Sequence, residues 1–166
     1  FVLAAIISAC NSEPKFVVKG DIKGSDSITF ILQKREGGKI VTIDSDKSIK
    51  GTFKMEGVVD FPDQVLLTAL NTRNRTTFYL ENAKITITGT LDSLFDAKIT
   101  GSKTQDEFKS FIALNKPLAD KYQVLLTEFQ SARANNDTAR MSKIRKNALD
   151  IEKEMKTMQK EFIKNN

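Results

Sequence analysis

Few side chains in this sequence are of a type that could do chemistry. The chain has 166 residues with one cysteine, Cys10, and no histidine. These counts exclude a Ser-His-Asp triad, a Cys-His pair and an imidazole metal ligand. Asp44 and Asp46 resemble the start of a calcium loop, but its sixth and twelfth positions require glycine and glutamate, and Ile49 and Met55 stand there. We interpret the two aspartates as a hairpin-end turn, and we expect no metal, no cofactor and no catalytic residue.

Three weaker patterns also carry polar chemistry. Gly20 and Gly24 have neither the spacing nor the strand-to-helix context of a phosphate-binding loop. Glu81 could pair with another carboxylate for acid–base work, but the Asn-Ala that follows it is typical of a turn. Arg73 and Arg75 flank an exposed loop tip and form a candidate ligand loop that could hold an anion. A loop that only improves solubility is the favoured interpretation of these arginines.

Cys10 has a distinctive position in the chain. It closes the apolar run FVLAAIISAC, and the polar stretch NSEPK follows. Residues 3–9 have the composition of a secretory apolar region, and the small residues before Cys10 suit cleavage by a signal peptidase. A cysteine directly after such a cut is typical of a bacterial lipoprotein box, in which the thiol is acylated. The alternative is a buried N-terminal strand in which the cysteine is incidental.

The lipoprotein interpretation predicts a compartment and an attachment. Residues 1–9 are then the end of a signal peptide and residues 10–15 a lipid-anchored linker, with the lipid bilayer as a partner through acylated Cys10. We expect a cell-envelope protein that faces the periplasm or the cell surface. Because the chain begins without Met and without a basic segment, we interpret it as part of a longer precursor.

Composition indicates an ordinary globular protein. Hydrophobic residues make up 40% of the chain and charged residues 28%, and no apolar run approaches the roughly 20 residues of a spanning helix. The net charge is +5, and most of the excess lies after residue 101, interleaved with acidic residues. Because no run of five like charges and no aromatic–basic stripe is present, we expect no nucleic-acid partner.

Alternating apolar and polar residues dominate from Phe16 to Thr100. The turn Glu36-Gly37-Gly38-Lys39 and the loop from Asn71 to Arg75 separate runs typical of half-buried strands. Eight short strands are predicted, opening near residues 16–18 and 28–33 and continuing at 39–44, 51–59, 64–70, 76–81, 84–90 and 96–100. Residues 16–101 are therefore predicted to form an antiparallel β-sandwich or barrel, without a parallel α/β unit.

The apolar spacing changes to three and four residues after Gly101. Thr104 and Glu107 predict a capping box, Asp137 predicts a second cap, and Pro117 is expected to kink or break the first helix. The second segment repeats apolar residues as in a coiled-coil seam: Met141, Ile144, Ala148, Ile151, Met155, Met158 and Phe162. Residues 102–166 are therefore predicted to form an antiparallel αα-hairpin, and the whole chain an α+β protein.

The order of short motifs carries a family resemblance. The motifs are VKGDI at 18–22, IDS at 43–45, GTFKMEG at 51–57, Pro62, FYLEN at 78–82, ITITG at 85–89 and ITGS at 99–102. This order resembles the N-terminal domain of unknown function that precedes a thioredoxin-like domain in exported Gram-negative lipoproteins of the TlpA/ResA kind. The resemblance is best over residues 16–112. It implies that redox chemistry belongs to a Cys-x-x-Cys pair in a downstream domain, so it assigns no catalytic residue to this chain.

Together these observations predict a function without catalysis. The first hypothesis is an accessory and tethering domain of a membrane-anchored thiol-disulfide oxidoreductase, with a C-terminal thioredoxin-like domain in cis as its partner. The alternative is a free-standing lipoprotein module that binds a glycan, a peptide or a protein partner. A hydrolase using Asp44 and Asp46 is the least favoured hypothesis.

Overall fold

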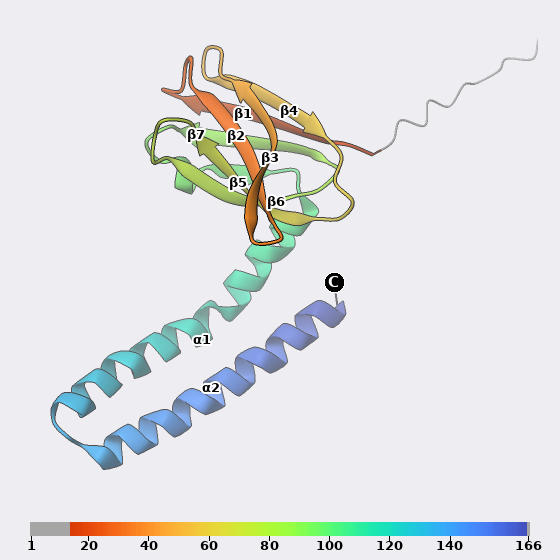
Figure 1. Cartoon of the computed structure of the whole chain (residues 1–166). Coiled ribbons are helices and arrows are strands. Elements are labelled where there is room, and N and C mark those ends of the chain that lie inside the picture. Colours follow the sequence, from red (N-terminus) through yellow and green to blue (C-terminus); the bar gives the residue numbers. More distant parts are fainter. Residues whose placement is uncertain (1–13, 166) are drawn as a thin grey trace, which may run out of the picture. The chain divides into compact units, whose positions relative to one another are not determined.

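The structure is a computed structural model that describes residues 14–165. Eight strands are followed by two long helices (Figure 1), which confirms the predicted α+β class. The chain divides between Gln105 and Asp106 into a β unit and a helical unit. The elements are β1 Phe16–Lys23, β2 Thr29–Glu36, β3 Lys39–Lys47, β4 Thr52–Gly57, β5 Asp63–Ala69, β6 Arg75–Leu80, β7 Lys84–Thr90, the 3-10 helix η1 Leu94–Asp96, β8 Lys98–Thr100, α1 Lys103–Ala134 and α2 Thr138–Asn165.

The strands of the β unit form two four-stranded sheets. The first sheet has the order β4-β1-β7-β8, and the second has the order β3-β2-β5-β6. The sheets are not closed on themselves, so the barrel alternative is wrong and the open two-sheet arrangement is correct. Most neighbours are antiparallel, but β1 and β7 pair in parallel from Val17↔Lys84 to Lys23↔Thr90. The sequence pattern did not predict this pair, because alternation indicates a strand without indicating its neighbour.

A core of alternate strand residues lies between inward-facing sides of the sheets. Each such large apolar side chain stabilises the fold by about 1.5–3 kcal/mol when fully buried. At its centre the rings of Phe30 and Phe53 stack with centroids 4.3 Å apart. Gly20 lies opposite Phe53 in the register, and a Cβ at Gly20 would fall 2.0 Å from the Phe53 ring. Fully buried members of this core include Phe16, Val18, Ile22, Leu32, Met55, Leu67, Leu80, Ile85, Ile87 and Leu94.

The predicted strand positions are confirmed to within a few residues. Gly37 and Gly38 both have positive φ at the predicted hairpin turn, where glycine has no Cβ to clash. The register shifts between Leu32 and Gln33, so Ile43 is an extra residue on β3. The last predicted strand is shorter than expected, because Asp96 belongs to η1 and β8 begins at Lys98.

The helical unit is the predicted antiparallel hairpin of α1 and α2. The rings of Phe111 and Phe162 lie 5.3 Å apart, and the Tyr122 hydroxyl donates to Glu152 at 3.1 Å. The seam residues of α2 are buried or half-buried, and Ile144 is only 5% exposed. None of the helices in the described part of the chain has the length and apolar character needed to cross a bilayer.

Two predicted features of the helix termini and interior have different outcomes. The amide of Arg140 donates to Asp137 at 2.9 Å, so the predicted cap of α2 is confirmed. Pro117 was predicted to kink or break the first helix; the break is wrong, because α1 is one continuous helix. A proline in a helix interior costs about 3 kcal/mol. Packing on both sides of it, including Leu118 at 4% exposure, holds the helical path.

Candidate functional site

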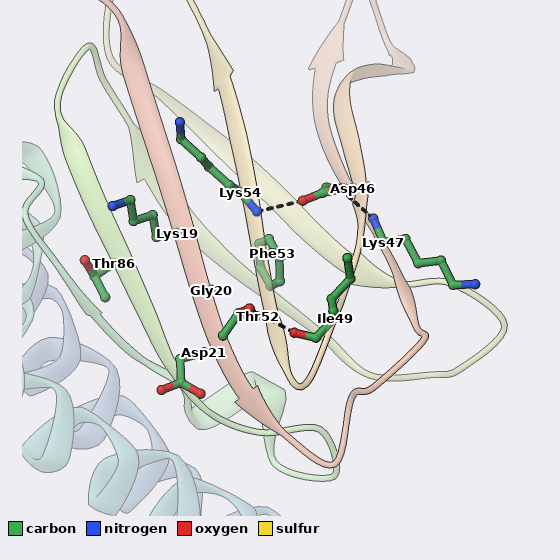
Figure 2. Close-up of a pocket in the computed structure, with 10 residues that line it drawn as sticks. All are labelled: Lys19, Gly20, Asp21, Asp46, Lys47, Ile49, Thr52, Phe53, Lys54 and Thr86. Carbon is green, nitrogen blue, oxygen red and sulfur yellow. Dashed lines mark hydrogen bonds between the residues drawn. The ribbon is translucent and has the colours of Figure 1, made fainter.

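A hollow of the β unit lies at the β4 edge of the first sheet (Figure 2). It has a volume of about 510 Å³ and is open to solvent. Strands β1, β3, β4 and β7 contribute to its wall, together with the turn before β4. The lining residues are Lys19, Gly20, Asp21, Asp46, Lys47, Ile49, Thr52, Phe53, Lys54 and Thr86.

Strand register explains the polar side of this hollow. Lys19 on β1 lies opposite Lys54 on β4 and beside Thr86 on β7. Because side chains alternate along a strand, these three project from the same exposed face of the sheet. Two lysines directly opposite each other repel, which is unfavourable unless an anion compensates them. Lys54 contacts Glu56, whereas Lys19 has no ion pair among residues 14–165.

The acidic residues Asp44 and Asp46 act as acceptors for backbone amides. The Lys54 amide donates to Asp46 Oδ2 at 2.7 Å, and the Glu56 amide donates to Asp44 Oδ2 at 3.1 Å. Both acceptors lie on β3 two residues apart, and both donors lie two residues apart on the edge strand β4. The carboxylates thus satisfy edge amides that would otherwise be open to another chain. The expected hairpin-end turn is therefore wrong for these residues, because β3 continues to Lys47.

Glu56 is the most strongly perturbed acid of the described residues. Its carboxylate accepts a hydrogen bond from Lys15 at 2.6 Å and also contacts Lys54. The hydrogen bond from Lys15, followed by that from Lys54, lowers the pKa of Glu56 from 4.5 to about 2. An acid held this firmly in its charged form is a poor proton donor at neutral pH.

Glu81 has a structural role that the sequence did not reveal. Its carboxylate accepts the Thr104 amide at 3.3 Å and the Thr104 hydroxyl at 3.0 Å. Burial acts to raise the pKa of Glu81, but hydrogen bonds from Ser102, Thr104 and Lys103 outweigh it and the pKa is lowered. The negative charge therefore lies at the N-terminus of α1, where the helix dipole favours it.

The start of α1 differs from the predicted capping box. Ser102 is the residue that caps the helix, because its hydroxyl accepts the Gln105 amide at 3.1 Å. Thr104, the expected cap, lies two residues after Ser102 and instead binds Glu81. The side chain of Gln105 in turn accepts a hydrogen bond from the amide of Tyr79 on β6 at 2.9 Å, so this backbone donor of the edge strand is satisfied. The prediction failed because the helix is capped two residues earlier than expected, at Ser102, and Thr104 is bound by Glu81, which follows β6.

The candidate residues from the sequence do not come together. Arg75 is the first residue of β6 and lies opposite Thr68, and Arg73 is exposed in the preceding loop. Neither arginine lines the hollow of Figure 2. Cys10 lies outside the described residues. Sequence reasoning missed Lys19 and Lys54, because the two lysines meet only through the pairing of β1 with β4.

The hollow brings lysines and aspartates from several strands to one surface. Within residues 14–165 no group of three His, Cys, Asp or Glu side chains is placed to hold a metal ion. Lys19 offers a charge, and the exposed Thr86 offers a hydroxyl beside it. Figure 2 shows that Lys47 extends away from Lys54, so the two cations do not converge on one point. The hollow is open to solvent and most of its exposed lining is apolar, with lysine and aspartate side chains around it.

Comparison with known proteins identifies a family without a known activity. A family model described as a domain of unknown function (DUF4369) matches residues 16–108, which is more than half of the chain. No curated protein and no solved structure matches this chain. The match covers all eight strands and the first turn of α1. The chain therefore belongs to the family defined by that domain of unknown function, DUF4369.

Proposed function

We propose that this chain is a non-catalytic accessory and tethering domain, held at a membrane of the cell envelope through acylated Cys10. The observation that carries the proposal is the use of its carboxylates. Asp44 and Asp46 bind amides of β4, and Glu81 binds the first turn of α1. Groups with these fixed hydrogen bonds hold the fold together and are not available to transfer protons.

The attachment is tested by replacement of the only cysteine. In a Cys10→Ala variant expressed in its host, the protein should leave the membrane fraction and appear in the soluble fraction, because the proposed lipid anchor is then missing. Ser12→Ala changes a neighbouring residue without removing the thiol and serves as the control. A Cys10→Ala protein that still sediments with membranes would refute the lipid anchor.

We further propose that the domain works beside a thioredoxin-like domain of the same polypeptide. The support is the motif order of residues 16–112, which resembles the domain found before such redox domains. Sequencing of the gene past the codon for Asn166 tests this directly. A Trp-Cys-x-x-Cys stretch within the next hundred or so codons is expected, and a stop codon immediately after Asn166 would remove this part of the proposal.

A binding module is the second candidate, and the hollow of Figure 2 favours it. Lys19 has no ion pair among the described residues and faces Lys54 across the sheet. These features suit an anionic glycan, peptide or protein partner. Binding to acidic members of a glycan and peptide array should be lost in Lys19→Glu and kept in Lys39→Glu, which changes the same charge on the other sheet. Equal binding of both variants would count against this site.

A further inference from the structure

We propose that the loop between β4 and β5, residues 58–62, is a membrane-contact loop that places the side chains of Val58 and Phe61 in the interfacial region of a phospholipid bilayer. The inference rests on the proposed attachment through Cys10. It adds a second contact with the membrane and an orientation of the β unit. Its support is the exposed apolar side chains of the loop, the hydrogen bonds that fix the loop, and the position of the loop at one end of the sandwich.

The loop exposes two large apolar side chains. Val58 is 60% exposed and Phe61 is 69% exposed, and Pro62 is exposed beside them. Between them Val59 packs on the core of the β unit. Exposed single apolar residues are common, but two large ones in one five-residue loop give that loop an apolar surface that a bilayer could cover. A bilayer interface accepts aromatic and aliphatic side chains at this depth.

The loop is held in its exposed form by Asn82. The Val59 amide donates to Asn82 Oδ1 at 3.0 Å, and Asn82 Nδ2 donates to the Val59 carbonyl at 2.7 Å. One side chain therefore satisfies both backbone groups at the centre of the loop. Because Val59 is fixed on both its polar groups and its side chain, Val58 and Phe61 remain directed outward. A patch fixed in advance loses little conformational freedom when it meets a surface.

The loop lies at the end of the sandwich where the chain enters from Cys10. Phe16 opens β1 and pairs with Gly57, the last residue of β4, so the loop begins beside the start of β1 (Figure 1). Cys10 is six residues before Phe16, so the linker spans at most about 20 Å. Strand β1 has eight residues and is about 26 Å long. An anchored chain therefore keeps this end of the sandwich near the bilayer, and the opposite end can lie beyond the linker's reach.

Local charge indicates a neutral bilayer surface as the partner. Asp60 is exposed in the loop, and Lys15 nearby is paired with Glu56. With no excess of unpaired cations at the loop itself, contact depends on the apolar side chains and not on attraction to anionic lipids. Phosphatidylcholine vesicles are the matching probe.

The test uses two properties of the composition. The chain has no tryptophan, so a single introduced tryptophan is the only indole fluorophore, and Cys10 is the only thiol for coupling. The chain is coupled through Cys10 to phosphatidylcholine vesicles that carry some maleimide-headgroup lipid, which supplies an anchor whether or not Cys10 is acylated in cells. Two variants are compared, Phe61→Trp and Phe95→Trp. Phe95 is 76% exposed and follows β7 at the far end of β1, where Lys23 pairs with Thr90.

We expect the fluorescence of Phe61→Trp to shift to shorter wavelength on coupling and to be quenched by lipids brominated near the headgroup. Phe95→Trp should show neither change. No shift in either variant, or equal shifts in both, would overturn the proposal. A shift of Phe61→Trp that grows with protein concentration without vesicles would also overturn it, because it would assign the loop to contacts between copies. Failure of the natural anchor appears separately, in the fractionation of Cys10→Ala.

Discussion

Replacement of Glu81 by glutamine should destabilise the β unit by about 1–2 kcal/mol at neutral pH. The carboxylate accepts the amide and the hydroxyl of Thr104, at 3.3 and 3.0 Å. Glutamine keeps the shape but removes the charge, and its amide group replaces one acceptor oxygen with a donor. A hydrogen bond to a charged group contributes about 1.5–3 kcal/mol and a charge at a helix N-terminus about 0.3–1 kcal/mol. Because Glu81 is half-exposed, solvent screening reduces both contributions. The expected loss of stability is therefore about 1–2 kcal/mol, below the sum of the two contributions.

Urea unfolding followed by amide NMR signals of β6 and β7 measures the effect in the β unit alone. With a slope of about 1–3 kcal/mol per molar urea, the midpoint should fall by roughly 0.3–2 M. Glu36→Gln is the matched control, because Glu36 only pairs with Lys34 at 3.4 Å on an exposed hairpin. That control should change the free energy of unfolding by less than about 0.5 kcal/mol.

The pH dependence gives the same prediction a second, independent test. The pKa of Glu81 is lower in the folded state than its ordinary value of 4.5. A lowered pKa stabilises the fold above the ordinary value, and this stabilisation is lost as the pH falls through the folded-state pKa. The gap between wild type and Glu81→Gln should therefore close as the medium becomes more acidic. A gap that is absent at neutral pH, or that stays constant on acidification, would refute the capping role.

Three further predictions concern the same unit. Gly20→Ala should lower the stability measured by thermal unfolding by about 1–3 kcal/mol. Adding Phe53→Leu to this variant should restore part of the loss, because the smaller side chain leaves room for the new methyl group. Equal stability of Gly20→Ala and wild type would contradict the close packing. Asp46→Asn should accelerate hydrogen exchange at the Lys54 amide, which donates to Asp46 in the wild type. Unchanged exchange would argue against the contact at the β4 edge. A carbon-13 NMR titration should find the pKa of Glu56 near 2, and in Lys15→Ala the value should rise toward 4.5; a wild-type value near 4.5 would contradict the ion pairs.

Local sequence patterns were enough to predict the elements of the fold. Alternation along residues 84–90 corresponds to β7 without error, and the two glycines at 37 and 38 placed a hairpin. The seam from Met141 to Phe162 predicted α2 and the face that it buries. These features depend on neighbours within a few residues, so a single strand or helix carries its own signal.

Contacts between distant segments could not be predicted in the same way. The parallel pairing of β1 with β7 joins residues 17–23 to 84–90, and the sequence of neither strand indicates which strand is its partner. Glu81 and Asn82 were interpreted as ordinary turn residues, because their partners at Thr104 and Val59 are each 23 positions away. Pro117 is expected on local grounds to kink or break the first helix, and the break does not occur because packing of the surrounding seam outweighs that preference. The candidate site failed for the same reason, since Lys19 and Lys54 meet only through pairing of β1 with β4.

The central claim is that this family member is held at a membrane through Cys10 and acts there as a tethering domain. Mass spectrometry of the N-terminal peptide of the protein, isolated from cell envelopes of its host, tests it most directly. The account predicts a peptide that begins at Cys10 and carries the added mass of a diacylglyceryl group on the thiol. A peptide in which residues before Cys10 are still attached and the thiol is free would contradict the account.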